Sequence, residues 1–300
     1  MTSQERQEQQ RQAAAHIDLW VLNEEELEGA WALKIAVEAD DEVDNLSDFE
    51  YVHQAIFARE NTEVALARVR GLQAFRQHYK IHDTPEEGVE LVNAFMNKHP
   101  GFLLSVDIDE THGHYVMIYD YARRKPHEVK TEEDWRGHLG GMYYLMHALQ
   151  NNIHACREGI VHICECEGMG WENFSYEGVT RNFSHLYENY PMKHKELSWL
   201  RTPMVGNILY SFIKPMLGPE VVRKFHLGCT FNGYDGRLDE IFLTPNAEVA
   251  KQNLLQKVHG LLSVRYQVEQ AYKLPDLPLD IGLEEDDDDE EDDEDFMDDE

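Results

Sequence analysis

Segments typical of β-strands alternate with segments of helical periodicity over residues 102–227, and this alternation limits the folds open to the chain. Runs of Val, Ile and aromatic residues predict strands at 102–106, 115–121, 160–166, 197–201 and 222–227. Apolar residues at helical spacing predict helices between them at 132–156, 174–190 and 205–217. Because strand–helix–strand connections join parallel strands and place helices over the sheet, the sequence predicts an α/β fold.

The remainder of the chain divides by periodicity and composition. Amphipathic segments predict a small N-terminal helical module, in which Ser47 and Glu50 have capping-box spacing and Pro85 begins a helix. A further helical stretch follows the α/β region. The expected division is a flexible N-terminus, the helical module, the α/β domain, a C-terminal helical segment and a disordered acidic tail, at residues 1–22, 23–98, 99–245, 246–279 and 280–300.

The chain is strongly acidic, with 58 Asp and Glu residues against 27 Lys and Arg. Fifteen of the acidic residues lie in the last seventeen positions, a run that repels itself and cannot bury apolar area. This charge disfavours bare nucleic acid as a partner, because phosphate binding needs a basic surface. The tail either keeps the protein in solution or attracts a basic partner, which could be another protein or a basic patch of this chain.

The N-terminal residues lack the apolar stretch of a signal peptide, and no segment of the sequence is apolar for long enough to span a membrane. The four cysteines, Cys156, Cys164, Cys166 and Cys229, are therefore expected to be free thiols in a reducing compartment. We expect a cytoplasmic protein that is at most peripheral to membranes.

The sequence contains no glycine motif for dinucleotides, no phosphate loop and no nucleophile-elbow motif. His162, Cys164 and Cys166 alternate along an expected strand, but three ligands at this spacing match no common zinc site. We expect no catalytic residue, no metal and no cofactor, and so a protein that is not an enzyme. An α/β enzyme of unrecognised type is the least favoured alternative.

Four segments between residues 190 and 228 resemble, in order, the CRAL-TRIO lipid-binding domain family. They are Tyr190-Pro191-Met192-Lys193 and residues 197–203, 212–217 and 222–228. Residues 159–168 resemble an earlier strand of the family, and residues 57–66 loosely resemble its N-terminal helical module. The amino-acid pattern of these segments is most similar to that of the α-tocopherol transfer and retinaldehyde-binding branch.

The resemblance implies a sheet with parallel strands, covered by helices around an apolar cavity, and a mobile gate helix after Pro203. The gate would be residues 205–217, and Gly206 and Gly218 are suitable hinges. Ligands across the family include phosphatidylinositol, tocopherol and retinoids. Met192 and Val221 depart from the residues typical of phosphatidylinositol-binding members, which argues against that ligand.

Candidate ligand contacts are bulky, mostly apolar residues of the expected helices and strands, although any single one is more often ordinary core. They are Tyr143, Met146, Ile163, Phe183, Leu186, Leu200, Leu209, Phe212 and Met216. Basic residues concentrate between Lys193 and Lys224 in this otherwise acidic chain. The candidates for contact with an anionic membrane are Lys193, Lys195, Arg223 and Lys224. The resemblance to the tocopherol-transfer branch implies that Lys193, Lys195 and Lys224 contact phosphoinositides.

The favoured function is a carrier that binds a hydrophobic small molecule or lipid in a gated pocket and transfers or presents it at membranes. A sixteen-carbon chain withdrawn from water gains about 12 kcal/mol. A bilayer offers a similar gain, so the pocket must exclude water equally well, and this requires a lid. The alternative is a non-catalytic lipid-sensing adaptor that recruits partners through its acidic tail or C-terminal helix.

Overall fold

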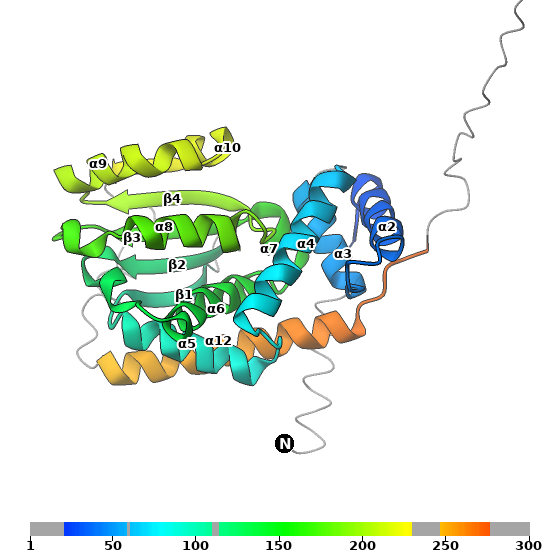
Figure 1. The fold of residues 1–300 in the computed structure, drawn as a ribbon, viewed down its shortest axis with the longest axis horizontal. Coiled ribbons are helices and arrows are strands. Elements are labelled where there is room, and N and C mark those ends of the chain that lie inside the picture. The colour runs from blue at the N-terminus through cyan, green and yellow to red at the C-terminus, as the bar shows by residue number, and fades with distance from the viewer. Residues whose placement is uncertain (1–20, 59–60, 110–113, 230–246, 277–300) are drawn as a thin grey trace, which may run out of the picture.

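The structure, a computed structural model, describes residues 21–58, 61–109, 114–229 and 247–276. Over these residues, a sheet of five strands forms the centre of an α/β domain, and helices from both ends of the chain pack beside it (Figure 1). A separate group of helices, drawn in blue, extends from one end of the sheet. The predicted α/β class is confirmed.

The strands lie in the sheet in chain order, from β1 to β5. β1 and β2 pair antiparallel, whereas β2–β3, β3–β4 and β4–β5 are parallel pairs. The parallel pairing brings the amino ends of β2, β3 and β4 to one end of the sheet and their carboxyl ends to the other. The strand bounds are Leu103–Asp109, His114–Asp120, Ile160–Glu165, His194–Leu200 and Phe225–Cys229.

Helices flank the sheet in two groups (Figure 1). One group packs on the β1 side, where α5 contacts α6 and both contact α12. The other follows β3 and β4: α8 continues as a single π-helical turn at Asn182–Tyr187, and α9 and α10 lie beyond β4. The bounds are Pro85–Lys98 for α5, Glu132–Leu149 for α6, Tyr176–Arg181 for α8, Met204–Ile213 for α9, Pro219–Arg223 for α10 and Ala247–Ala271 for α12.

Several predicted elements differ in extent from those observed, and two of the differences have a clear local cause. The helix predicted at 132–156 ends at Leu149, and a separate helix, α7 (Ile153–Glu158), begins after Asn152. Asn152 caps it, since its Oδ1 accepts a hydrogen bond from the Ala155 N–H at 2.9 Å. The strand predicted at 222–227 starts only at Phe225, because Pro219 begins the short helix α10 before it.

The N-terminal module is formed by α2 (Glu24–Glu38), α3 (Asp48–Ala58) and the first half of α4 (Thr62–Tyr79), which share a core of their own. Helix α5, which was expected in this module, packs in the main core with α6. The capping-box prediction is confirmed: the Glu50 N–H donates to Ser47 Oγ at 3.2 Å, and the Ser47 N–H donates to Glu50 Oε2 at 3.1 Å. Pro85 begins α5 as predicted.

Helix α12 joins the module to the α/β domain. Leu254, Leu255, Val258 and Leu262 are buried in the main core, whereas Val268 is buried in the core of the module. Near the latter, the buried Arg265 donates to Glu269 Oε1 at 2.6 Å and to the carbonyl oxygen of Gln150 at 2.5 Å. The C-terminal helical segment is therefore an integral part of the fold.

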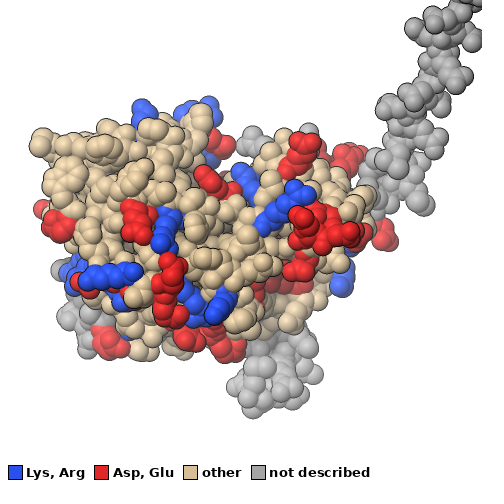
Figure 2. Space-filling model, viewed as in Figure 1, with Lys and Arg blue, Asp and Glu red and all other residues tan. Residues whose placement is uncertain are grey.

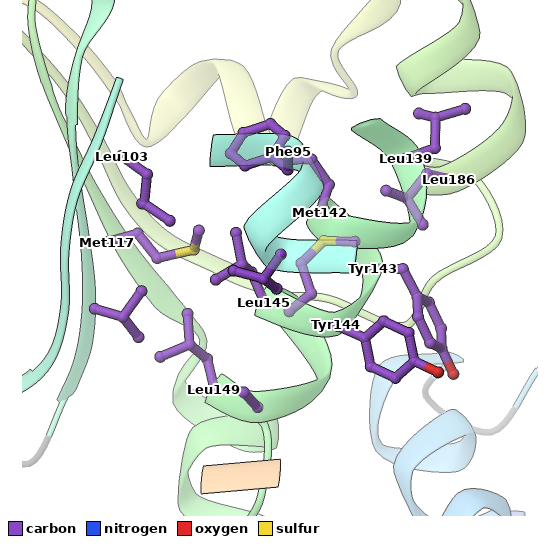
Figure 3. Close-up of a cluster of buried hydrophobic side chains, with 14 of the residues drawn as sticks. Phe95, Leu103, Met117, Leu139, Met142, Tyr143, Tyr144, Leu145, Leu149 and Leu186 are labelled. Atoms are coloured by element: carbon purple, nitrogen blue, oxygen red, sulfur yellow. The ribbon is translucent and has the colours of Figure 1, made fainter. Parts of the chain in front are cut away.

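Helices α5 and α6 approach each other closely in the main core. Figure 3 shows Phe95 of α5 beside Met142 of α6, with Leu145 and Leu149 directed toward Met117 of the sheet. The contact depends on a glycine in α6. A Cβ added at Gly141 would lie 2.5 Å from the Phe95 Cβ and 2.8 Å from the backbone oxygen of Leu91, so the two helices would have to move apart.

We expect Gly141→Ala to destabilise the protein by about 1–3 kcal/mol, the usual cost of overpacking. The matched control is Gly260→Ala in α12, where nothing lies within 4 Å of the added Cβ. That change should instead stabilise the protein by up to about 1 kcal/mol, because alanine favours helices. Urea unfolding of both variants tests the pair, and equal effects of the two substitutions would contradict it.

Candidate ligand-binding cavity

A cavity of about 610 Å³ lies between the sheet and the helices α8 and α9. Its volume falls within the range of about 300–1,000 Å³ that is typical of small-molecule sites. Its roof includes Phe183 and Tyr187 of the π-helical turn and Leu209 and Ile213 of α9. Its floor consists of side chains from β2, β3, β4 and β5: Tyr119, His162, Cys164, Leu197, Trp199 and Phe225.

Strand alternation decides which side chains meet the cavity. On β3, His162 and Cys164 line it, whereas Val161 and Ile163 lie in a separate buried cluster. Successive side chains of a strand point to opposite faces, so this cluster occupies the other face of the sheet. A helix residue, Met142 of α6, belongs both to the cavity wall and to the main core.

Charged side chains lie at the two ends of the cavity. Near the amino ends of β3 and β4, the lining includes Lys193, Glu188 and Arg68, and Arg68 Nε donates to the Glu188 carbonyl oxygen at 3.2 Å. Beyond the carboxyl end of β2, it includes Tyr121 and Arg124. The stretch between the ends is mostly apolar and aromatic, which suits an apolar guest.

Burial keeps the titratable groups of the floor uncharged at neutral pH. It lowers the pKa of His162 well below its usual value. It also lowers the pKa of His194 to about 4, with a smaller effect from Lys224. The same loss of hydration raises the pKa of the Cys164 thiol to about 12. The floor therefore offers neutral imidazole rings to a guest.

Three of the nine residues predicted to contact a ligand line the cavity: Phe183, Leu209 and Met216. Two others, Ile163 and Leu200, lie in the cluster on the opposite face of the sheet. The prediction chose the wrong face of the sheet for these two residues. Ile163 follows His162 and Leu200 follows Trp199, so both point away from the cavity.

The remaining four predicted contacts also lie outside the cavity lining. Tyr143, Met146 and Leu186 are fully buried in the main core, and Figure 3 shows Tyr143 on α6 and Leu186 next to Leu139 of the same helix. The Tyr143 hydroxyl donates to Asp83 Oδ1 at 2.7 Å, so it has a structural partner. Phe212 is 61% exposed, since it lies about 100° around α9 from Ile213, which faces inward.

The predicted hinges have different surroundings. Gly206 lies inside the first turn of α9, not before it, and is buried. A Cβ there would lie 2.6 Å from Thr202 Cγ2 and 2.8 Å from Met169 Cε, so close packing accounts for this glycine. Gly218 lies between α9 and α10, and a Cβ added there would have nothing within 4 Å.

The four basic residues predicted to meet a membrane also differ in environment. Lys193 lines the cavity, and Arg223 is exposed on α10. Lys195 forms an ion pair with Glu158 at 2.9 Å, and Lys224 forms one with Glu220 at 2.9 Å.

Sequence reasoning missed most of the floor and both charged ends. The floor residues His162 and Cys164 were considered only as metal ligands. Among the residues that the structure describes, no group of three or more His, Cys, Asp or Glu side chains could hold a metal ion. One signal was available: the polar His162 stands in an otherwise apolar strand and marks the face that is turned toward the cavity.

Helix α9 has two apolar faces. Leu209 and Ile213 face the cavity, while Met204, Ile208 and Phe212 are exposed on the other side, with exposed fractions of 78%, 37% and 61%. A helix that is apolar around its whole girth is usually buried on more than one side, whereas the outer face of α9 is exposed. In the described part of the chain, no helix is long and apolar enough to cross a membrane.

Residues 100–232 match the family model of the CRAL/TRIO domain. A comparison of the chain with curated proteins found no match. CRAL-TRIO domains bind hydrophobic ligands and transfer lipids. The mostly parallel sheet, the cavity under α9 and this match together support the assignment of residues 100–232 to the CRAL-TRIO family.

Proposed function

We propose that this protein binds one hydrophobic small molecule or lipid in the cavity under α9 and transfers or presents it at membranes. The observation that carries the proposal is a mostly apolar cavity of about 610 Å³, roofed in part by a helix whose outer face is also apolar. Binding needs no catalytic group, which fits a carrier that is not an enzyme.

The size of the cavity favours a ligand with a single chain or a small ring system. A cavity of about 610 Å³ lies in the middle of the range typical of sites for one small molecule. This supports a ligand of the kind handled by the tocopherol and retinaldehyde branch. Met192, which stands where phosphatidylinositol-binding members typically carry glutamate, lines the cavity and adds apolar surface there.

Helix α9 is the proposed gate. Its amino-terminal turn is held where Gly206 packs closely against Thr202 and Met169. Its carboxyl end leads to Gly218, around which there is open space. We propose that the helix turns outward about the Gly206 contact while Gly218 absorbs the change in backbone angles, which opens the roof.

The outer face of α9 is the proposed contact with membranes. In Figure 2, this upper part of the molecule is mostly uncharged, with Lys and Arg atoms at its margin, whereas acidic and basic side chains are interspersed elsewhere. Exposed apolar side chains that enter the interfacial region of a bilayer gain burial. Nearby basic residues such as Lys214 and Arg223 would each add about 1 kcal/mol on an anionic surface.

Phe212→Asp should weaken binding to phosphatidylserine-containing vesicles by about 10-fold or more, because it removes an exposed ring that would enter the bilayer and adds a repelled charge. Its affinity for a soluble apolar ligand should stay within about threefold, since Phe212 does not line the cavity. Vesicle co-sedimentation measures the first quantity, and ligand titration measures the second.

The control for this prediction is Ile35→Asp, which changes an exposed apolar residue on α2 that is 60% exposed. Vesicle binding of that variant should match the unaltered protein. If both variants lose vesicle binding equally, the contact is not specific to α9.

Transfer of a fluorescent apolar ligand between two vesicle populations tests the proposed function as a whole. We expect the protein to accelerate transfer, and we expect deletion of residues 284–300 to leave this acceleration intact. An adaptor would instead depend on that tail for its partner and would not accelerate transfer. No acceleration by the full chain would contradict the carrier.

A further inference from the structure

Arg124 is a buried cation at the carboxyl end of the cavity. Its side chain is only 5% exposed, and it belongs to the cavity lining. Its Nη1 donates to the Tyr121 hydroxyl at 3.0 Å, and its guanidinium lies 5.5 Å from the centre of the Tyr121 ring. Both contacts are with a neutral phenol, so neither neutralises the charge.

Among the residues that the structure describes, no carboxylate lies within ion-pair distance of Arg124. The other deeply buried arginines differ in this respect. Arg265 has Glu269 at 2.6 Å, and Arg76 has Glu50 at 2.8 Å. Buried charges in proteins are normally paired, because removing an ion from water is costly unless an opposite charge replaces the hydration. Among the described residues, Arg124 therefore lacks the carboxylate partner that Arg265 and Arg76 have.

The nearest titratable side chains supply no negative charge to Arg124. His99 and His138 both lie near it, and burial, with Arg124 as a further contributor, lowers the pKa of each ring below its usual value. These imidazoles are neutral and contribute no negative charge. The carboxyl end of the cavity is thus electropositive, although the protein as a whole is acidic.

The backbone that carries Arg124 is fixed in place. The side-chain amide of the buried Asn173 donates to the carbonyl oxygen of Ala122 at 2.8 Å and to that of Arg124 at 2.9 Å. Pro126 follows shortly after and is also buried. A guanidinium held in a rigid loop is preorganised, so little of its freedom is lost when it binds an anion.

We infer that the ligand is a single-chain amphiphile with a carboxylate head group, and that Arg124 is the counterion of this carboxylate. The inference deepens the proposed function and rests on it. The planar fork of an arginine matches a carboxylate with two parallel hydrogen bonds. The Tyr121 hydroxyl, which accepts from Arg124, keeps its own proton to donate to the same head group. The chain of the ligand would then extend over the floor toward Lys193.

The alternative is a ligand with a neutral head group such as an alcohol. His162 Nε2 and His194 Nδ1 have no hydrogen-bond partner among the described residues, and the two rings lie 5.0 Å apart. An alcohol could use these imidazoles, but it would leave the charge of Arg124 without compensation. A carboxylate would pair with Arg124. Leaving this buried cation unpaired costs more than leaving the two neutral imidazoles without a partner.

Uptake of radiolabelled hexadecanoic acid and hexadecan-1-ol from phosphatidylcholine vesicles tests the inference. The unaltered protein should prefer the acid, and Arg124→Gln should reduce acid uptake by about 10- to 100-fold while alcohol uptake changes by less than about threefold. Arg124→Lys, which keeps the charge but not the fork, should retain part of the preference. The matched control is Arg123→Gln, which alters the neighbouring arginine, an exposed residue paired with Asp120.

The outcomes separate the two claims. Equal uptake of acid and alcohol by the unaltered protein, or an unchanged preference in a folded Arg124→Gln variant, overturns the role of Arg124 and leaves the carrier function standing. Uptake of neither compound overturns both. Should Arg124→Gln fail to fold, the comparison of acid with alcohol in the unaltered protein and in Arg124→Lys still decides the question.

Discussion

Cys164→Phe should lower the affinity for a sixteen-carbon ligand by about 100-fold or more while the protein stays folded. Cys164 lies on the cavity floor, so the added ring enters space that the guest would occupy. Displacing about four methylene groups of the ligand from burial costs about 3 kcal/mol, which corresponds to about 100-fold in affinity. Stability should change little, because the ring fills a void and does not press on packed atoms.

Cys166→Phe is the matched comparison, because it introduces the same ring two residues further along. Cys166 is fully buried in the main core and does not line the cavity. Overpacking there should destabilise the protein by about 1–3 kcal/mol or more. Ligand titration should thus show a loss of affinity for Cys164→Phe, whereas thermal unfolding should show a loss of stability for Cys166→Phe. A stable Cys164→Phe protein with unchanged affinity would mean that the ligand does not lie over β3.

Glu269→Gln should destabilise the protein by about 3–5 kcal/mol at neutral pH, which is typical when one partner of a buried ion pair is removed. Glu269 Oε1 accepts from Arg265 Nε at 2.6 Å and lies 3.4 Å from His147 Nε2. Arg265 is 1% exposed and stacks on Phe49 with its guanidinium 3.7 Å from the ring centre. Without the carboxylate, this cation of α12 would stay buried and unpaired where the helix contacts the module.

The same carboxylate predicts a pH dependence. Burial alone would raise the pKa of Glu269, but Arg265 and His147 outweigh it and lower the pKa from 4.5 to about 2 in the folded state. A group with a depressed folded pKa stabilises the protein above its unfolded pKa. Its contribution is therefore complete above about pH 4.5 and is lost as the pH falls toward about 2, a difference of about 3 kcal/mol.

The measurement is the difference in unfolding free energy between the unaltered protein and Glu269→Gln at a series of pH values. This difference should shrink as the pH falls through the window from about 4.5 to 2. Glu248→Gln in the first, exposed turn of the same helix should change stability by no more than about 0.5 kcal/mol at any pH. A constant difference for Glu269→Gln would contradict the assignment of its pKa.

Much of the fold could be predicted because local signals agreed with the tertiary structure. The Ser47–Glu50 capping box, the proline that begins α5 and the apolar run of β3 each indicate one element with little ambiguity. The errors fall where one pattern fits two structures. Val221 and Val222 are compatible with a strand or a helix, and Pro219 favoured the helix.

The cavity was predicted less well than the fold because its lining depends on which face of each strand is turned inward. An error of one residue in this choice exchanged the floor residues Cys164 and Trp199 for Ile163 and Leu200. Helix α9 poses a different difficulty. Both of its faces are apolar, so the sequence alone does not separate the inward Ile213 from the outward Phe212.

Arg124 was missed for a further physical reason. A single arginine in a loop after a strand resembles ordinary surface, and its neighbour Arg123 is indeed exposed and paired with Asp120. Only the three-dimensional arrangement reveals that Arg124 is buried without a carboxylate partner among the described residues. Burial and missing charge compensation are long-range properties, which no local pattern encodes.

Native mass spectrometry tests the central claim most directly. The protein is incubated with vesicles that contain single-chain lipids, separated from them, and sprayed under conditions that preserve complexes. The account predicts one bound organic molecule for each chain, together with its loss in Cys164→Phe. A spectrum that contains only the bare chain after repeated incubation, or that shows equal occupancy in Cys164→Phe, would contradict a ligand held in the cavity under α9.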